Sequence, residues 1–334
     1  MSGLKELLKK GLGLGDMAFN AGEGAINWFP GHMAAARRAI RQRLKLSDLV
    51  IEVRDARLPL SSTNTDLQPH LSAKRRVVAL NKKDLANPNI MHKWAHYFET
   101  RKQDCIAINA HSQSSVRKLL ELVEFKLKEA ICREPTLLVM VVGVPNIAHK
   151  PSIYVLDSPG VLVPSISDIE TGLKLALAGS VKDSVVGEER IAQYLLAVLD
   201  TRGTPLHWKH LNNRRLDGIE YEAEANHEYS LKNLKPKRRN PPNRSDLVYV
   251  EDLVMGVQHA LYSTLTEFNG NVEDENDLEC LIDLQFSALQ KAMKIPHKAS
   301  EARLMVSKKL LTLFRTGKLG PFILDDVPDV KPVS

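Results

Sequence analysis

Cysteine is scarce in this chain, and long apolar runs are missing. The 334 residues include only three cysteines, Cys105, Cys132 and Cys280, and these have neither the pairing of a disulfide framework nor the spacing of a metal site. We therefore expect small buried side chains in a reducing compartment. No apolar run approaches the roughly 20 residues of a membrane-spanning helix, so we expect no membrane span.

Charge of neither sign is scarce, but basic residues are in slight excess. Lysine and arginine number 46 against 40 acidic residues, which gives a formal net charge of +6. The basic residues are clustered, which is typical of a protein with an acidic partner such as RNA, and a mildly basic soluble enzyme is the alternative. The length favours roughly two domains, and a 43% share of hydrophobic residues is ordinary for a soluble globular protein.

The first residues form a basic amphipathic pattern. Met1–Leu14 would place four leucines on one helical face, with lysines between them. This pattern favours an organelle-targeting segment at positions 1–26, although Glu6 and the lack of arginine count against it. A short surface helix explains the pattern equally well.

A guanine-binding motif follows a short apolar run. Val77–Leu80 is long enough for one buried parallel strand, and it ends on Asn81-Lys82-Lys83-Asp84. In this N-K-x-D pattern the aspartate accepts from the N1–H and the amine of guanine, the asparagine reaches O6 and N7, and the lysine stem packs on the base. Adenine lacks the matching donors and would leave the aspartate unpaired. Ligands of open α/β sheets bind at this end of a strand.

Strands and helices alternate around this motif. The apolar runs predict strands at Leu49–Val53, Val77–Leu80, Cys105–Asn109, Leu137–Val142 and Ile153–Leu156. Helical spacing predicts helices at Ala34–Leu46, Ile90–Thr100 and Ser114–Ile131. This order indicates a doubly wound α/β domain. We expect a second base-contacting loop at Ile108–His111. The Asp55–Arg57 pair after the first strand is expected to be a surface ion pair of little energetic value.

A phosphate-binding loop begins but is not completed. Gly143-Val144-Pro145-Asn146 follows an apolar strand, as a Walker A loop does. The chain then continues as Ile147–Ser152 and contains no Gly-Lys-Ser/Thr, and Pro151 disfavours the start of a helix at Lys150. After the next strand comes Asp157-Ser158-Pro159-Gly160, a D-x-x-G box, whose aspartate holds Mg²⁺ through water and whose glycine N–H meets the γ-phosphate.

The guanine motif precedes the Walker A fragment and the D-x-x-G box, the reverse of the usual order. The permuted chain resembles the circularly permuted GTPases that assist ribosome assembly, in their mitochondrial and bacterial large-subunit forms. The motifs that carry this resemblance are Asn27–Met33, Asp55–Arg57, Asn81–Asp84, Gly143–Asn146, Leu156–Leu162 and Glu170–Gly179. The resemblance extends from Asn27 to about Leu324. It implies an incomplete circularly permuted P-loop GTPase domain at 27–200, an all-α domain at 246–325, and a mitochondrial location.

The resemblance also implies site residues, cofactors and partners. GTP and Mg²⁺ would bind, and slow hydrolysis would control association with the large ribosomal subunit and its rRNA. His32 would position the hydrolytic water, and Asp157 would be the metal residue. The residues that contact the nucleotide would be Asn81, Lys82, Asp84, Asn109, Ala110, Gly143, Pro145, Asn146, Asp157 and Gly160. A peripheral association with the inner mitochondrial membrane is a further implication.

This chain departs from the family at one place, after Asn146. The Gly-Lys-Ser loop, its helix, the switch threonine and a strand are missing, as after an internal deletion. Losing three charge-assisted hydrogen bonds would cost on the order of 5–9 kcal/mol, or roughly four to six decades of affinity. We therefore expect weak binding of GTP and Mg²⁺, poor hydrolysis and a partly uncovered sheet. A nucleotide-independent rRNA-binding assembly protein and a non-functional splice product are the alternatives.

The rest of the chain is expected to be helical apart from one linker. Helical spacing predicts helices at Asp168–Gly179, Glu188–Leu199, Leu247–Thr266, Glu279–Met293 and Lys298–Arg315. Positions 201–245 are poor in apolar spacing and end in a basic run, which indicates a flexible linker. RNA contact and a simple tether are the two interpretations of this run, and the helical domain has the same pair of alternatives, RNA contact or packing.

Overall fold

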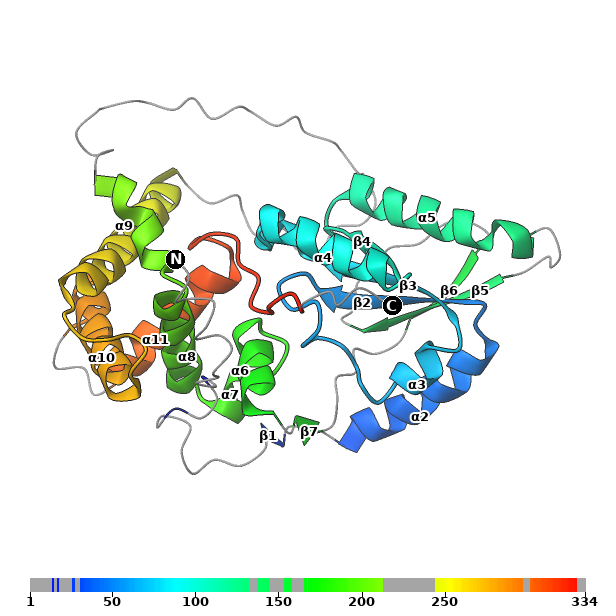
Figure 1. The fold of residues 1–334 in the computed structure, drawn as a ribbon, viewed down its shortest axis with the longest axis horizontal. Helices are drawn as coiled ribbons and strands as arrows, with labels where there is room; N and C mark the ends of the chain where they lie inside the picture. The colour runs from blue at the N-terminus through cyan, green and yellow to red at the C-terminus, as the bar shows by residue number, and fades with distance from the viewer. Residues whose placement is uncertain are drawn as a thin grey trace. The chain divides into compact units, whose positions relative to one another are not determined.

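The computed structural model of the chain is shown in Figure 1, and it divides into two compact units. It describes residues 14, 17, 26–27, 31–131, 137–143, 153–157, 165–166, 168–212, 244–296 and 301–328. The first unit comprises Met1–Ile191 together with Phe314–Ser334, and the second is Ala192–Leu313. The C-terminal tail therefore belongs to the first unit, whereas the sequence-based division assigned the chain up to residue 325 to the helical domain.

The first unit is built on a five-stranded parallel sheet. Its strands are β2 (Leu49–Asp55), β3 (Arg75–Asn81), β4 (Asp104–Ala107), β5 (Leu137–Gly143) and β6 (Ile153–Asp157), in the order β4-β3-β2-β5-β6. All five predicted strands are confirmed, and so is the α/β class. The register pairs Asp55 with Asn81 and Val53 with Gly143. The motif residues at the strand ends therefore meet at one edge of the sheet.

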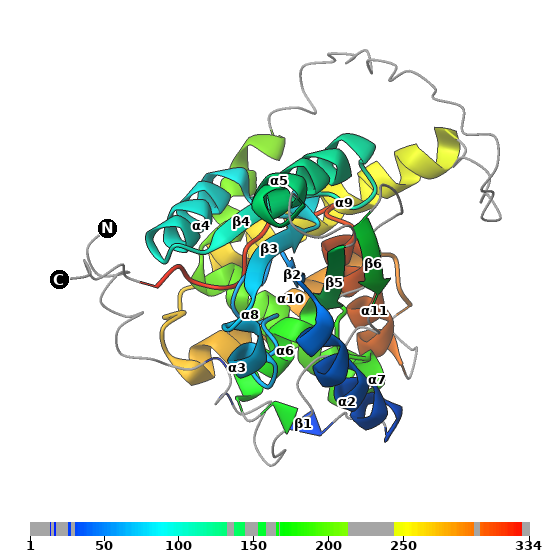
Figure 2. The ribbon, with the colours of Figure 1, turned by 90° about the vertical axis from the view of Figure 1, so that its right-hand side faces the viewer.

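Helices cover both sides of this sheet (Figures 1 and 2). Side chains of α5 (Gln113–Ile131), including Leu119 and Val123, pack on one side. On the other side, α2 (Gly31–Leu46) and α3 (Gln68–Leu71) pack on β2 and β5, and α4 (Pro88–Thr100) packs on β3 through its buried Trp94. The strands read as continuous apolar runs because both of their faces are buried.

Strands β5 and β6 are parallel neighbours and are joined by a short connection. Leu137 pairs with Ile153, so the chain must return along about 20 Å of strand between Gly143 and Ile153. The nine intervening residues reach about 30 Å when extended, which suffices for the return but leaves no length for a covering helix. Among the described residues β6 has no extensive contact with a helix. The expected gap in the cover of the sheet stays a prediction, because the segments before and after β6 lie outside the described residues.

Short elements complete the first unit. Two-residue strands β1 (Ile26–Asn27) and β7 (Ser165–Ile166) pair antiparallel, and the sequence did not predict them. Strand β7 is followed by α6 (Ile169–Leu177) and α7 (Asp183–Val186). Asp168 caps α6 by accepting from the backbone N–H groups of Glu170 and Thr171. An N-cap of this kind satisfies backbone donors that have no partner within the helix.

The second unit is helical, as predicted. Its helices are α8 (Glu188–Thr201), within which the division between the units falls, α9 (Arg244–Glu267), α10 (Glu275–Ala292) and α11 (Ala302–Arg315). The expected linker at 201–245 is wrong in its first part, because Thr204–Asn212 forms a 3₁₀ helix, η3, that packs on α9. The basic run before α9 lies outside the described residues. No described helix is long and apolar enough to cross a membrane.

The expectation of buried cysteines is only partly met. Cys105 is half-buried, and burial raises the pKa of its thiol to about 12, so it is an unreactive thiol at neutral pH. Cys280 is exposed, which corrects the prediction for this residue. It lies on α10, whose apolar face is formed by other residues. The side chain of Cys132 lies outside the described residues.

A buried carboxyl group lies in the second unit. Asp200 of α8 is 3% exposed and accepts from Gln285 Nε2 of α10 at 2.8 Å. Burial raises the pKa of Asp200 to about 7, and the hydrogen bond from Gln285 opposes this shift. The folded unit therefore holds a proton that the unfolded chain releases near its ordinary pKa of 3.8. Asp200 should destabilise the unit increasingly as the pH rises from about 4 to about 7.

We predict that Asp200→Asn stabilises the second unit at pH 8, by up to about 4 kcal/mol, because the amide carries no charge to bury. Hydrogen exchange at α8 and α10, compared between the two proteins from pH 4 to pH 8, measures this difference. The two proteins should be alike at pH 4 and diverge towards pH 7. A wild-type unit that gains stability relative to the variant over this range would contradict the prediction.

Candidate functional site

The carboxyl ends of β3 and β4 are held together by one side chain, that of Asn81. Its Oδ1 accepts from the backbone N–H of Lys82 at 2.8 Å and from that of Ala110 at 2.9 Å. Backbone bonds from Ile108 to Leu80 and from Lys83 to Ile108 reinforce the junction. The structure thus brings together the two loops that were predicted to contact a base. Because the Oδ1 is occupied, the Nδ2 of Asn81 is the atom left for a base, and it donates, as the O6/N7 edge of guanine requires.

Lys82 adopts a strained conformation at this junction. Its φ of 62° and ψ of 38° lie in the left-handed region, which is uncommon for residues other than glycine. The Nζ donates to Asp55 Oδ2 at 2.9 Å, so the aliphatic stem is held at the end of β2. Strain of this kind persists only where surrounding bonds enforce it, and it concentrates at functional sites.

Asp84 lies in the exposed 3₁₀ helix η2 (Lys83–Leu85), just beyond Lys82. Its carboxylate has no hydrogen bond or ion pair with any residue that the structure describes. Two acceptor oxygens are therefore available for a ligand. The N–H of Ala110, by contrast, is already donated to Asn81, so a base contact from Ala110 would have to share that bond.

The Asp55–Arg57 pair is buried, which corrects the expectation of a weak surface pair. Both residues are 2% exposed, and the Arg57 guanidinium donates to the two carboxylate oxygens at 3.0 and 2.8 Å. Burial alone would raise the pKa of Asp55, but the hydrogen bonds and charges of Arg57 and Lys82 outweigh it and lower the pKa below its ordinary value. Arg57 Nη2 also donates to the Ala178 carbonyl at 2.9 Å, which joins the turn after β2 to the end of α6.

The C-terminal tail covers this turn and explains the burial. Leu324 N donates to the Arg57 carbonyl at 2.9 Å, and Phe322 N donates to the Leu85 carbonyl, directly after Asp84, at 3.0 Å. Asp325 accepts from the backbone N–H groups of Leu60 and Ser61, each at 2.8 Å. Ile323 packs in the core cluster that contains Trp94. Sequence reasoning missed the tail because its partners lie more than 200 residues away and it matches no local motif.

The remaining predicted site residues are described only in part. His32 lies in the first turn of α2, Gly143 ends β5 and Asp157 ends β6, and for these three residues only the backbone is described. Asn109 lies in the loop that Asn81 holds, and its Oδ1 accepts from the His111 N–H. Pro145, Asn146 and Gly160 lie outside the described residues. Within the described part of the chain, no cluster of histidine, cysteine and carboxylate side chains could hold a metal.

No family model matches the chain, but individual proteins do. It is 63% identical to the Arabidopsis thaliana protein named Short integuments 2, mitochondrial, with 98% of this chain and 96% of that protein aligned. It is 32% identical to DAR GTPase 2, mitochondrial, of the same plant, with 90% of each aligned. The mouse Mitochondrial ribosome-associated GTPase 1 is 33% identical over 54% of this chain and 69% of its own length.

The lengths of these alignments carry further information. The alignment with Short integuments 2 extends over 371 residues, 37 more than the 334 residues of this chain. At least 37 aligned positions of that relative therefore have no residue opposite them here.

We predict that Asp325→Ala lowers the free energy of unfolding of the first unit by about 3 kcal/mol, because two backbone N–H groups lose a charged acceptor. Urea unfolding measures the loss, and hydrogen exchange at Leu60 and Ser61 locates it. Glu121→Ala removes an exposed carboxylate of α5 in the same unit and is the matched control. Equal unfolding midpoints for the two variants would show that the tail does not hold this turn.

Proposed function

Because the chain belongs to the family of circularly permuted GTPases, we propose that it is a guanine-nucleotide-binding factor in the assembly of the large mitochondrial ribosomal subunit. The observation that supports the proposal is the loop after β3, in which Asn81 accepts from Lys82 N–H, Lys82 Nζ donates to Asp55 and Asp84 follows in an exposed position. The predicted mitochondrial location is confirmed by the relatives. The ribosomal partner is supported by the name of the mouse relative and by the net charge of +6.

Recognition of guanine rests on groups that are available in the described structure. The free carboxylate of Asp84 would accept from the guanine N1–H and amine, and the Asn81 Nδ2 would donate to the opposite edge. The Lys82 stem, held by Asp55, would lie against the base. Adenine presents no matching pair of donors to the Asp84 carboxylate, so it would leave that group desolvated and unpaired.

The phosphate side is proposed to be incomplete. Nine residues join Gly143 to Ile153, and none of them provides the Gly-Lys-Ser sequence of a phosphate loop. GTP would therefore bind through its base and ribose, with the triphosphate and Mg²⁺ held weakly. Asp157 and Gly160 would face the γ-phosphate and the metal, and His32 would lie beside the attacking water. Without the loop lysine and the switch threonine, we propose that hydrolysis is slow or absent.

A nucleotide-independent rRNA-binding assembly protein is the second candidate, and the missing loop favours it. In this candidate function the protein still binds the ribosomal subunit, but no nucleotide regulates the binding. A peripheral association with the inner mitochondrial membrane, which the family resemblance implies, would be compatible with either function. Cooperative unfolding of the whole first unit would argue against a third interpretation, a splice product that folds poorly.

We predict that Asp84→Asn weakens guanosine binding by roughly a hundredfold or more, because it removes the charged acceptor of two hydrogen bonds. Xanthosine, which presents an acceptor in place of the guanine amine, should bind the variant better than guanosine does. Competition titrations with the two nucleosides measure the change. Lys83→Ala, at the exposed neighbouring position, is the control, and unchanged guanosine binding by Asp84→Asn would argue against base recognition by this loop.

We also predict that inserting a Gly-Lys-Ser loop with its helix, switch threonine and strand after Asn146 raises GTP affinity by roughly four to six decades and restores turnover. Isothermal titration and phosphate release measure the two effects. The same insertion with alanine in place of its Gly-Lys-Ser lysine is the control, and it should recover little of either. Micromolar GTP affinity or brisk hydrolysis in the unmodified chain would contradict the incomplete phosphate site.

A further inference from the structure

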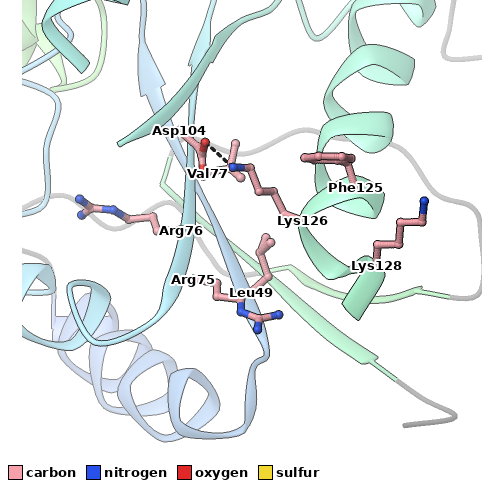
Figure 3. Close-up of a pocket in the computed structure, with 8 residues that line it drawn as sticks. All are labelled: Leu49, Arg75, Arg76, Val77, Asp104, Phe125, Lys126 and Lys128. Atoms are coloured by element: carbon pink, nitrogen blue, oxygen red, sulfur yellow. Dashed lines mark ion pairs between the residues drawn. The ribbon is translucent and has the colours of Figure 1, made fainter. Parts of the chain in front are cut away.

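A cavity of about 640 Å³ (Figure 3) lies near the starts of β2 and β3. The Asn81–Asp84 loop lies at the opposite end of these strands. The apolar floor of the cavity is formed by Leu49 and Val77, near the starts of β2 and β3, and its wall by the last turns of α5. Asn81 lies at the other end of β3, four residues beyond Val77, or about 13 Å at the rise of a β-strand. The cavity is therefore separate from the proposed nucleotide site.

An exposed aromatic ring lines this cavity. Phe125 is 70% exposed, and only Leu46, at the end of α2, is a more exposed large apolar side chain in the described part of the chain. The core-facing residues of α5, such as Val123 and Leu127, lie on another side of the helix. Figure 3 shows the Phe125 ring beside Lys126 among the residues that line the cavity. Packing within the unit does not account for a ring left open in this way.

The charge around the ring is positive. Arg75 and Lys128 line the cavity, are exposed, and have no ion pair with any residue that the structure describes. Lys126 pairs with Asp104 at 2.7 Å, which neutralises the one carboxylate in the lining. Arg76 pairs with Glu52 behind the cavity. Two cations therefore remain available in the lining of the cavity, together with an exposed ring.

We propose that this cavity binds a single-stranded segment of RNA, with one base stacked on Phe125 and the flanking phosphates on Arg75 and Lys128. Exposed rings beside basic groups recognise unpaired bases, because every base has a π-face and every linkage has a negative charge. A duplex keeps its bases stacked on one another and offers no free face to the ring. The inference rests on the proposed function for its choice of rRNA as partner. It goes beyond that function in two ways. It names the place on this chain where the rRNA would bind, and it specifies that the bound RNA is single-stranded.

A membrane surface is the main competitor, because anionic lipids would also attract Arg75 and Lys128. Insertion into lipid calls for an apolar face that projects from the surface. Phe125 instead lines a concave site above an apolar floor, which suits a flat base. The geometry thus favours an unpaired base over a bilayer.

The test is fluorescence anisotropy of the full chain with an unstructured labelled oligoribonucleotide and with an RNA duplex of equal length. Phe125→Ala should weaken single-strand binding about tenfold, as expected for one lost stack, and leave the salt dependence unchanged. Arg75→Ala and Lys128→Ala should each reduce the slope of log affinity against log salt by about 0.7. The duplex should bind more weakly than the single strand and be insensitive to Phe125→Ala.

Matched controls are available in the chain. Tyr249→Ala removes an exposed ring of α9, and Lys118→Ala removes an exposed cation of α5 outside the cavity, and both should bind RNA as wild type does. Full RNA affinity in Phe125→Ala would overturn the proposal, and so would loss in Tyr249→Ala alone. Sedimentation with anionic vesicles that depends on Phe125, with RNA binding unaffected, would assign the cavity to a membrane.

The same variants separate this proposal from the proposed function. Guanosine binding by Phe125→Ala should equal that of wild type, because the ring lies at the other edge of the sheet. A wild-type chain that binds RNA through Phe125 and binds no guanine nucleotide would refute the nucleotide function and leave the RNA site standing. If the chain binds guanosine and its RNA affinity is unchanged by Phe125→Ala, the RNA site is refuted and the nucleotide function stands.

Discussion

The site depends on one buried carboxylate, that of Asp55. Arg57 donates to both of its oxygens and Lys82 donates to Oδ2, so the negative charge is met by two cations within 3.0 Å. Removing one partner of a buried pair of this kind typically costs about 3–5 kcal/mol, because the remaining charge is left without compensation. Through its partners Asp55 joins the turn after β2, the guanine loop and the end of α6.

The proposed nucleotide site has two parts, one for the base and one for the phosphates. The base-reading half is held by contacts made entirely within the described first unit: Asn81 with Ala110, Lys82 with Asp55, and the tail with the turns around Arg57 and Leu85. The phosphate half would need a loop between β5 and β6, where the chain is nine residues long. Strands β5 and β6 pair directly in the sheet. In the proposed function, the phosphate contacts would therefore be weak while the loop at Asn81–Asp84 keeps its contacts.

Local features of the fold were predictable from the sequence, and long-range ones were not. The strands and the loop at Asn81–Asp84 could be predicted from short runs such as Val77–Leu80 and the four residues after it. Such predictions need no knowledge of distant residues. The burial of Asp55 and Arg57 was predicted wrongly, because the residues that cover them, Phe322 to Asp325, lie over 260 positions away. The 3₁₀ helix at Thr204–Asn212 was missed because its apolar residues lack helical spacing. The ring of Phe125 could be placed only when the strands beside α5 were known.

The central claim is that the protein recognises the guanine base but does not hold the phosphates. A comparison of guanosine with GTP tests this claim directly. The measurement is the affinity of the full chain for guanosine and for GTP, titrated under the same conditions with magnesium present. Nearly equal affinities are predicted, because the phosphates would gain no charge-assisted bonds. An affinity for GTP that exceeds the affinity for guanosine by several decades would contradict the account, because it would mean that the chain binds the triphosphate.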